Sequence, residues 1–233
     1  MPAKTARERA RAEITGEIKE AARRRIAAQG AVGLSLRAVA RDVGLVSSAV
    51  YRYFPSRDDL ITALLVDAYN DIGRAAEEAL AATPADDPAA RWRAVTRAIR
   101  HWALAHRHEY ALLYGSPVPG YRAPELTIGP ASRVTGALAS VVADAARAGD
   151  LTAGSPAPAL PPALRDELVR VADVALPGSP PDVVFRALVA WTQVFGLVSF
   201  ELFGHLENVV EDRVTFFDRA TAAMAGFVGL PAG

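Results

Sequence analysis

Apolar residues recur at intervals of three and four along almost the whole chain, which is the spacing of an α-helix with one buried face. No segment shows the alternation of apolar and polar residues, bounded by hairpin turns, that is typical of a β-strand. Glycine- and proline-rich breaks separate the helical segments, and the chain has no internal repeat. The sequence therefore predicts an all-α protein, and 233 residues are enough for a well-buried core.

The breaks also predict the individual helices. These are expected at about residues 5–29, 35–43, 47–53, 56–82, 88–106, 109–114, 127–148, 162–175, 182–206 and 211–228. Ser35 and Asp87 are expected N-caps, and Ser56 followed by Asp59 has the pattern of a capping box. The Pro- and Ala-rich residues 152–162 are expected to be mobile.

Basic residues are concentrated at the start of the chain. The sequence has 26 Lys and Arg against 26 Asp and Glu, but residues 1–57 hold 12 basic and 5 acidic residues, a net charge of +7. The remainder, with 14 basic and 21 acidic residues, has a net charge of −7. Such asymmetry is expected of a polyanion-binding module on a body that does not bind the polyanion, although a well-solvated first helix gives the same count.

Other kinds of site find no support in the sequence. There is no cysteine for a disulfide, a thiol nucleophile or a Cys-ligated metal. His106 and His108 do not share a helical face, and residues 115–117 lack the second glycine of a nucleophile elbow. Glu201 and His205, four residues apart, are expected to pair or to cap a helix end structurally. We therefore expect no metal, no cofactor and no enzymatic activity.

The chain is expected to be cytoplasmic and to have no membrane partner. Its first 25 residues alternate charged residues with alanine and contain no apolar core of a signal peptide. The longest apolar-rich stretch, residues 187–200, falls short of the roughly 20 apolar residues needed to cross a bilayer. It is expected to be a buried helix.

The segment from Leu34 to Arg57, LSLRAVARDVGLVSSAVYRYFPSR, contains two short helices joined at Gly44. The expected packing residues are Leu36, Val39, Ala40, Val43, Val50 and Phe54. The opposite side of the second helix presents Ser47, Ser48, Ala49, Tyr51, Arg52 and Tyr53. This arrangement suits a helix-turn-helix, whose second helix enters the major groove of DNA. An ordinary corner in an all-α protein has the same periodicity, so the pattern alone leaves both readings open.

The sequence LSLRAVARDVGL…AVYRYFPSRDDL resembles the DNA-binding domain of the tetracycline-repressor (TetR) family of bacterial transcriptional regulators, over about residues 10–70. The resemblance implies DNA contacts by Ser35, Arg37, Ser47, Ser48, Ala49, Tyr51, Arg52, Tyr53 and Arg57. In the family pattern Ser35, Tyr51, Tyr53 and Arg57 are at phosphate-contacting positions. Ser47, Ser48, Ala49 and Arg52 fall where base edges and the nearby backbone are contacted.

Three further features of this region concern its helix cap and its basic residues. Val46 stands where the family has Ser or Thr, so the cap of the second helix is expected to shift to Ser47. The arginines at 7, 9 and 11 form either an arm onto DNA or a solvated helix face. The run at residues 23–25 is expected to be a solvated face.

Residues 106–125 and 191–208 resemble the WHG-type C-terminal regulatory domain of some TetR-family proteins. This implies an all-α ligand-binding and dimerisation domain at 71–233, following a DNA-binding domain at 1–70 with its motif at about 34–54. The last two expected helices are apolar on several sides and form either part of a four-helix dimer interface or intrachain core. Their apolar residues are Val183, Val184, Leu188, Trp191, Val194, Leu197, Val198, Leu202, Val214, Phe217, Ala220 and Met224.

Aromatic residues of the second half are candidates for an apolar ligand pocket, although each is more often core, and no ligand contact is assigned. They are Trp92, Trp102, Tyr110, Tyr114, Tyr121, Phe185, Trp191 and Phe195. The expected function is a homodimeric repressor that a small-molecule effector releases from a palindromic double-stranded DNA operator. The alternatives are an activator of the same kind and a dimeric small-molecule-binding protein that no longer engages DNA.

Overall fold

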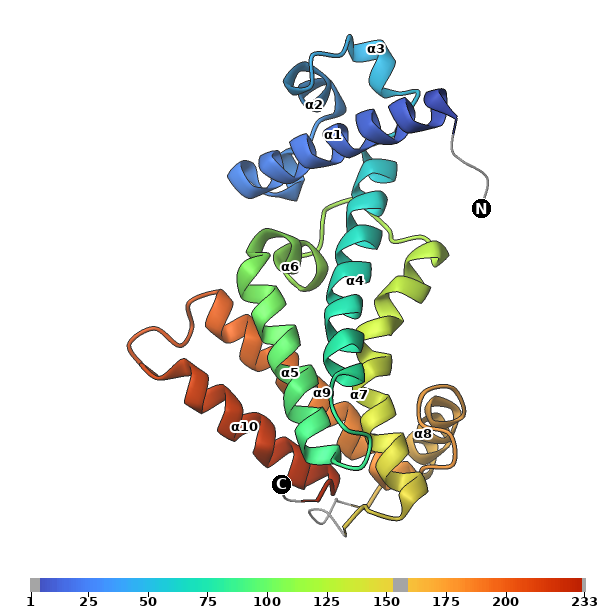
Figure 1. Ribbon diagram of the computed structural model, residues 1–233, viewed down its shortest axis with the longest axis vertical. Helices are drawn as coiled ribbons and strands as arrows, with labels where there is room; N and C mark the ends of the chain where they lie inside the picture. The colour runs from blue at the N-terminus through green and yellow to red at the C-terminus, as the bar shows by residue number, and fades with distance from the viewer. Residues whose placement is uncertain (1–4, 153–158, 232–233) are drawn as a thin grey trace. The chain divides into compact units, whose positions relative to one another are not determined.

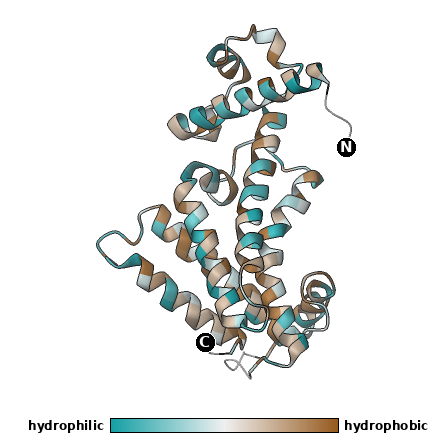
Figure 2. Ribbon diagram, viewed as in Figure 1, coloured by the Kyte–Doolittle hydropathy of each residue, from teal (hydrophilic) through white to brown (hydrophobic). Residues whose placement is uncertain are grey.

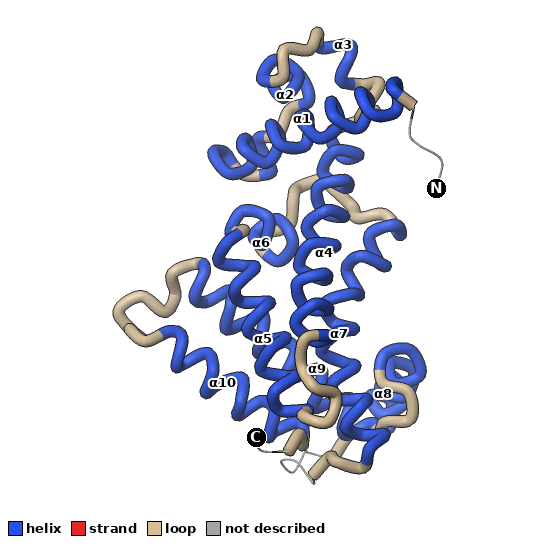
Figure 3. Tube along the Cα trace, viewed as in Figure 1, coloured by secondary structure: helices blue, strands red, loops and turns tan. Residues whose placement is uncertain are grey.

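The computed structural model describes residues 5–152 and 159–231, and most of these residues are helical (Figures 1 and 3). The helices are α1 (Ala6–Gln29), α2 (Leu36–Asp42), α3 (Ser47–Val50), α4 (Arg57–Ala81), α5 (Pro88–Ala105), α6 (Arg107–Tyr114), α7 (Ile128–Ala148), α8 (Pro162–Ala175), α9 (Pro181–Leu202) and α10 (Arg213–Val228), with 3₁₀ turns η1 (Ala31–Gly33) and η2 (Glu125–Thr127). The described ranges contain no strand, so the all-α prediction is confirmed. Most of the expected mobile segment, residues 153–158, lies outside the described residues.

The helices form two compact units. Unit 1 combines Met1–Ala68, described from Thr5 onward, with His106–Ile128; unit 2 combines Tyr69–Ala105 with Gly129–Gly233. Helix α4 contributes its first part to unit 1 and its second part to unit 2. The predicted division between residues 70 and 71 stays a prediction. It differs from the compact units at residues 106–128, which it assigns to the second domain, whereas α6 packs against α1 in unit 1.

Unit 1 is built around apolar residues of α1 to α4. Hydrophilic residues cover most of α1 (Figure 2), and its buried positions recur at helical spacing. The buried residues of these four helices and of the turn between α3 and α4 include Ile18, Ala21, Ala22, Ile26, Leu36, Val39, Ala40, Val50, Phe54, Leu60 and Leu64. The expected packing faces are therefore confirmed except at Val43, which is half-buried because α2 ends one residue earlier.

Several helix boundaries follow the predicted caps. Ser56 and Asp59 form the reciprocal capping box at the start of α4, with Ser56 N to Asp59 Oδ2 at 2.9 Å and Asp59 N to Ser56 Oγ at 3.1 Å. Asp87 accepts from Ala90 N at 2.8 Å as the N-cap of α5. Ser35 occupies the N-cap position of α2, but its side chain makes no capping hydrogen bond.

Two predicted boundaries are wrong by three residues or more. Helix α3 ends at Val50 rather than at residue 53, and its N-cap is Val46, so the cap does not shift to Ser47. Helix α9 ends at Leu202 rather than at residue 206, because the chain turns at Gly204, where φ is +83° and favours glycine.

Unit 2 is a helical bundle in which α10 packs against α9 and α5, and α8 packs against α9 (Figure 1). Half of the twelve apolar residues expected on the last two helices are intrachain core: Val183, Val184, Val194, Val198, Leu202 and Phe217 are buried within the chain itself. The intrachain reading therefore holds for these residues.

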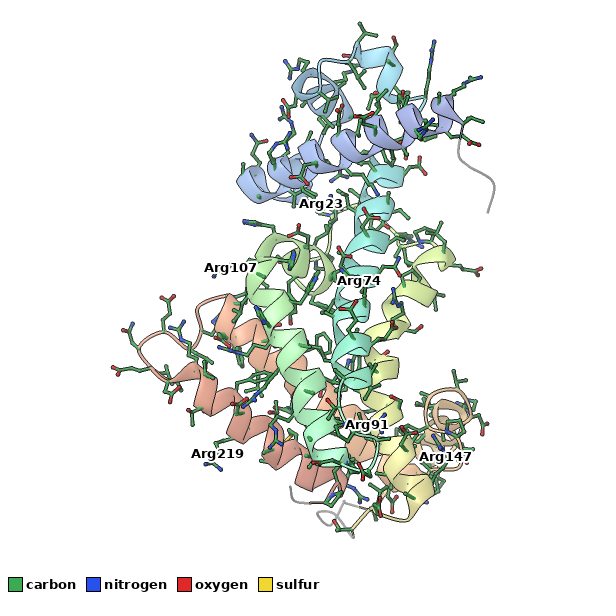
Figure 4. All side chains as sticks on the ribbon, in the orientation of Figure 1. Arg23, Arg74, Arg91, Arg107, Arg147 and Arg219 are labelled. Carbon is green, nitrogen blue, oxygen red and sulfur yellow. The ribbon has the colours of Figure 1, made fainter. Side chains whose placement is uncertain are left out.

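Charged pairs also lie inside unit 2. Arg100 binds Glu201 through two hydrogen bonds of 2.7 and 2.5 Å, and Glu201 is buried. The expected pairing of Glu201 with His205 is wrong, since His205 instead stacks edge-on against Phe200 with ring centroids 5.2 Å apart. Arg91, labelled in Figure 4, donates to Asp144 at 2.8 Å.

Two helical segments, Glu125–Ala148 and Pro181–Leu202, are long and apolar enough to cross a membrane by length and composition alone. A core helix of a soluble bundle passes the same test, and both segments contribute buried residues such as Val141 and Val194 to the interior described above.

Candidate functional site

Helices α2 and α3 present one face to solvent and pack the other into unit 1. The turn between them depends on Gly44, whose φ of +70° places it in the left-handed region, where a side chain is strained. Leu45 N donates to Ala40 O at 2.9 Å and closes the turn. The exposed face carries Ser35, Arg37, Ser47, Ser48, Tyr51 and Arg52, while Ala49, Tyr53 and Arg57 are half-buried. The nine expected DNA-contacting residues thus lie between the N-cap of α2, at Ser35, and the first residue of α4, Arg57.

The turn after α3 is held in place by Arg11. Arg11 of α1 donates from Nη2 to the carbonyl of Arg52 at 3.1 Å, and its guanidinium lies 5.4 Å from the centre of the Tyr53 ring. The backbone bond from Tyr53 N to Val50 O, at 3.0 Å, completes the turn before Pro55. The sequence allows Arg11 to be part of a DNA-binding arm or of a solvated helix face; it predicts neither contact, because no local pattern indicates a partner 41 residues away.

Arg57 is engaged inside unit 1. Its Nη2 donates to the carbonyl oxygens of Ala31 at 2.9 Å and of Val32 at 3.4 Å, so the side chain fastens η1 to the start of α4. Its side chain is 30% exposed, which leaves part of the guanidinium accessible. Contact with phosphate by Arg57, like the contacts of the other eight residues, stays a prediction.

The basic run at residues 23–25 is not a solvated face throughout. Arg25 binds Asp42 through two hydrogen bonds of 2.6 and 2.7 Å, which lower the pKa of the Asp42 carboxyl and raise that of Arg25. Arg23, labelled in Figure 4, and Lys19 both donate to Asp67, at 2.8 and 2.6 Å. The solvated-face prediction therefore holds only for Arg24.

Between residues 5 and 57, five arginines are free for an external anion. Their side chains are exposed and make neither an ion pair nor a hydrogen bond within the described residues: Arg7, Arg9, Arg37, Arg41 and Arg52. Arg37 and Arg52 belong to the candidate face itself. Because their charge is not neutralised by nearby carboxylates, this face suits a polyanion such as a DNA backbone.

Unit 2 contains a cavity of about 430 Å³ among α5, α7, α8 and α9. Of the eight aromatic candidates, Trp92 and Trp191 line it. Tyr110, Tyr114 and Tyr121 lie in unit 1, where the Tyr121 hydroxyl is 2.9 Å from that of Thr62. Among the described residues, no three His, Asp or Glu side chains are placed to hold a metal ion.

The arrangement is matched by known proteins. Residues 18–64 match the family model described as bacterial regulatory proteins, tetR family, and residues 92–224 match that of the tetracyclin repressor-like C-terminal domain. The HTH-type transcriptional regulators Rv1816 of Mycobacterium tuberculosis and Mb1846 of Mycobacterium bovis are each 42% identical over 214 residues, which is 91% of this chain and 91% of theirs.

Solved structures agree in fold. The crystal structure of SCO4313 has a TM-score of 0.78 and 33% identity, covering 95% of this chain and 100% of that one. A protein from Rhodococcus sp. RHA1 has a TM-score of 0.67 and 25% identity, covering 94% and 95% of the two chains. Together with the helix-turn-helix face, these matches show that the chain belongs to the TetR family of bacterial transcriptional regulators.

Proposed function

We propose that the protein is a homodimeric repressor that reads a palindromic DNA operator with α3 and leaves it when a small molecule binds. The observation that carries this proposal is the exposed face of α2 and α3, with unpaired Arg37 and Arg52 beside the hydroxyl groups of Ser47, Ser48 and Tyr51. Arginine can donate two hydrogen bonds to guanine in the major groove, and tyrosine and serine hydroxyls can donate to phosphate.

A dimer is supported by an apolar surface that the chain leaves uncovered. On α9, Phe200 is 54% exposed, and on α10, Phe216 is 39% exposed, with Ala223 also exposed. Two copies of such a helix pair can form a four-helix interface about a twofold axis. The dimer would bring two copies of α3 to successive major grooves, about 34 Å apart or a multiple of that distance.

The regulatory step requires an effector that binds one arrangement of the dimer better than another. Helix α4 runs through both units without a break and is the element through which we expect the change to pass. The chain performs this function in the cytoplasm, without catalysing a reaction and without a cofactor. Repression rather than activation is the form that we propose.

The direct test is binding of genomic DNA fragments by the purified protein over a series of salt concentrations. We expect Arg52→Ala to weaken binding to the selected operator by about tenfold or more and to relax its base preference. Tyr51→Phe is expected to weaken binding to all sequences alike, since a phosphate contact carries no base information.

Arg74→Ala is the matched control, because it removes the same charge from an exposed position of α4 in unit 2 (Figure 4). Its operator affinity is expected to equal that of the unchanged protein. Absence of sequence-selective binding at every salt concentration would contradict the proposal and favour the dimeric small-molecule-binding alternative. Unchanged operator affinity in Arg52→Ala would contradict the assignment of α3. Sedimentation of an Ala223→Arg variant as a monomer would support the α9–α10 interface, and an unaltered dimer would contradict it.

A further inference from the structure

We propose that Arg11 of α1 is a positioning residue for base reading: it holds the turn after α3 in the shape that Arg52 needs to discriminate between DNA sequences, and it contacts no phosphate itself. This inference rests on the function proposed above. It adds a residue of α1, outside the helix-turn-helix, on which operator specificity depends. The contacts that carry it lie within unit 1.

Helix α3 is too short to fix the residues that follow it. It has four residues, Ser47–Val50, and the side chain of its N-cap, Val46, accepts no hydrogen bond. A helix of this length is unstable alone, so its shape depends on contacts with the rest of the protein. Val50 and Phe54 are buried and anchor one side of this segment. The other side, which carries Arg52, is exposed and requires a separate support.

Arg11 contacts the turn after α3 at two points. Its Nη2 donates to the carbonyl oxygen of Arg52 at 3.1 Å, and its guanidinium carbon lies 5.4 Å from the centre of the Tyr53 ring. One planar group thus joins the backbone of one residue to the side chain of the next. Because rotation of the turn would break both contacts together, Arg11 restricts the direction in which the Arg52 side chain leaves the backbone.

Helix α1 can act as the support because it is itself fixed within unit 1. Ile18 and Ala22 are buried in the core, and Lys19 and Arg23 both bind Asp67 of α4. The first part of α1, residues 6–13, is exposed throughout. The side chain of residue 11 therefore reaches the α3 turn from a solvated part of a helix whose later turns are anchored.

Arg11 differs in its contacts from the two arginines that precede it. Arg7 and Arg9 are exposed and make neither an ion pair nor a hydrogen bond among the described residues. A free arginine that meets phosphate strengthens binding to every sequence and steepens its salt dependence. A residue that positions a base-reading side chain strengthens binding to the operator alone. Specificity and salt dependence therefore distinguish the two roles.

The first measurement follows hydrogen exchange of backbone amides in the DNA-free protein. The variant is Arg11→Met, because methionine has a similar helix propensity but neither a charge nor a donor. Arg9→Met is the matched control, since it makes the same change in the same exposed part of α1. Both variants are checked for unchanged helical content, which we expect because both side chains are exposed.

The amides to be followed are those of Tyr53 and Phe54, which both donate to Val50 O at 3.0 Å. We expect them to exchange about fivefold faster in Arg11→Met than in the unchanged protein, because the turn opens more often once its support is lost. Their exchange is expected to be unchanged in Arg9→Met. Equal exchange rates in the two variants would show that Arg11 does not hold the turn and would overturn the proposal.

The second measurement compares affinity for the selected operator with affinity for a scrambled fragment of the same length, over a series of salt concentrations. Arg11→Met is expected to lower the ratio of the two affinities about fivefold, to change the affinity for the scrambled fragment less than about twofold, and to leave the salt slope unchanged. A lost phosphate contact would instead weaken both fragments alike and reduce the slope by about 0.9 for each contact. That result, or an equal fall of the ratio in Arg9→Met, would overturn the proposal.

A double variant tests whether Arg11 acts through Arg52. The Arg52→Ala protein is expected to have lost the base preference that Arg11 supports. Adding Arg11→Met to it is therefore expected to lower the affinity ratio less than about twofold. A further fall of about fivefold in this background would overturn Arg52 as the residue that Arg11 positions.

The two measurements separate this inference from the proposed function. A protein that binds no fragment selectively, although Arg11 slows the exchange of the turn amides, would overturn the regulator and the role in base reading together. Selective operator binding with an affinity ratio that Arg11→Met leaves unchanged would uphold the regulator and overturn the positioning role of Arg11 alone.

Discussion

The indole Nε1 of Trp92 in α5 donates a hydrogen bond of 2.9 Å to the backbone carbonyl of Thr221 in α10. The Trp92 ring also lines the cavity, and Thr221 is buried on the inner side of α10. A side chain that lines the cavity is therefore hydrogen-bonded directly to the helix that carries Phe216 and the proposed dimer surface.

Replacing Trp92 by Phe is expected to lower the free energy of unfolding by about 1–3 kcal/mol, because it removes this buried hydrogen bond as well as part of the ring. Trp191→Phe is the matched control, since the same change of ring there removes no bond to the protein. Urea unfolding of the two variants measures the difference, which we expect to be about 1 kcal/mol. Equal losses would show that the Trp92 hydrogen bond does not contribute.

Arg100 and Glu201 form a pair whose partners depend on each other. Their side chains are 16% and 7% exposed, and the Arg100 guanidinium also lies over the Phe217 ring at 5.5 Å. Glu201→Ala is expected to lower stability by about 2–4 kcal/mol, since it leaves Arg100 mostly buried without a counter-charge. The double variant Arg100→Met/Glu201→Met is expected to recover most of this loss. A double-mutant cycle in urea checks the coupling, and simple additivity would contradict it.

Stability is expected to fall at acid pH in part through Asp218. Hydrogen bonds from Arg97, at 2.8 and 2.6 Å, hold the pKa of the Asp218 carboxyl below its ordinary value. Because the folded-state pKa is the lower one, the pair stabilises the fold above the unfolded-state pKa, about 3.9, and loses this effect as the pH falls through the folded-state value.

The Glu77 carboxyl, hydrogen-bonded by Arg133, has a lowered pKa for the same reason and acts in the same direction. Unfolding measured between pH 7 and pH 2 should show a shallower acid decline for Asp218→Asn than for the unchanged protein. A parallel decline in both proteins would contradict the role of this pair.

Val46 occupies the N-cap of α3 with a side chain that cannot accept a hydrogen bond. Val46→Ser is expected to raise the stability of the protein by about 0.5–1 kcal/mol, since serine can accept from a backbone N–H of the first turn. Val32→Ser is the control, because Val32 is similarly exposed, at 68% against 71%, and lies within η1 rather than at the N-cap of a helix. Thermal unfolding compares the two, and an equal shift would rule out capping as the cause.

Tyr51 and Arg57 are both predicted phosphate contacts, but their surroundings differ. Tyr51→Phe is expected to reduce DNA affinity and leave the melting temperature unchanged, because its side chain is exposed. Arg57→Ala is expected to reduce both, since it also releases the carbonyls of Ala31 and Val32. Fragment binding and thermal unfolding of both variants separate these effects. A fully stable Arg57→Ala protein would contradict the structural role of Arg57.

Local chemistry explains which elements could be predicted from the sequence. The helices, the capping box of Ser56 and Asp59, and the N-cap at Asp87 depend on residues within four positions of one another, and the sequence displays them directly. The end of α9 was missed because the apolar pattern continues to Leu206, whereas the chain already turns at Gly204.

Long-range partners could not be predicted. Arg11 holds the turn after α3, and Asp67 binds Lys19 and Arg23, across separations of more than forty residues that leave no periodic trace. The cavity in unit 2 could not be predicted from the sequence either. Trp92 and Trp191 look alike in sequence, and only the packing of the helices shows that one indole N–H has a partner while the other has none among the described residues.

The ion pairs within unit 1 determine how salt acts on DNA binding. A protein releases condensed counterions from DNA only through cations that are free to meet phosphate. Arg25 is committed to Asp42, and Lys19 and Arg23 are committed to Asp67, so these three contribute little to that release. The slope of log affinity against log salt concentration is therefore expected to depend on the number of free arginines on the candidate face and at the start of α1, and not on the net charge of residues 1–57.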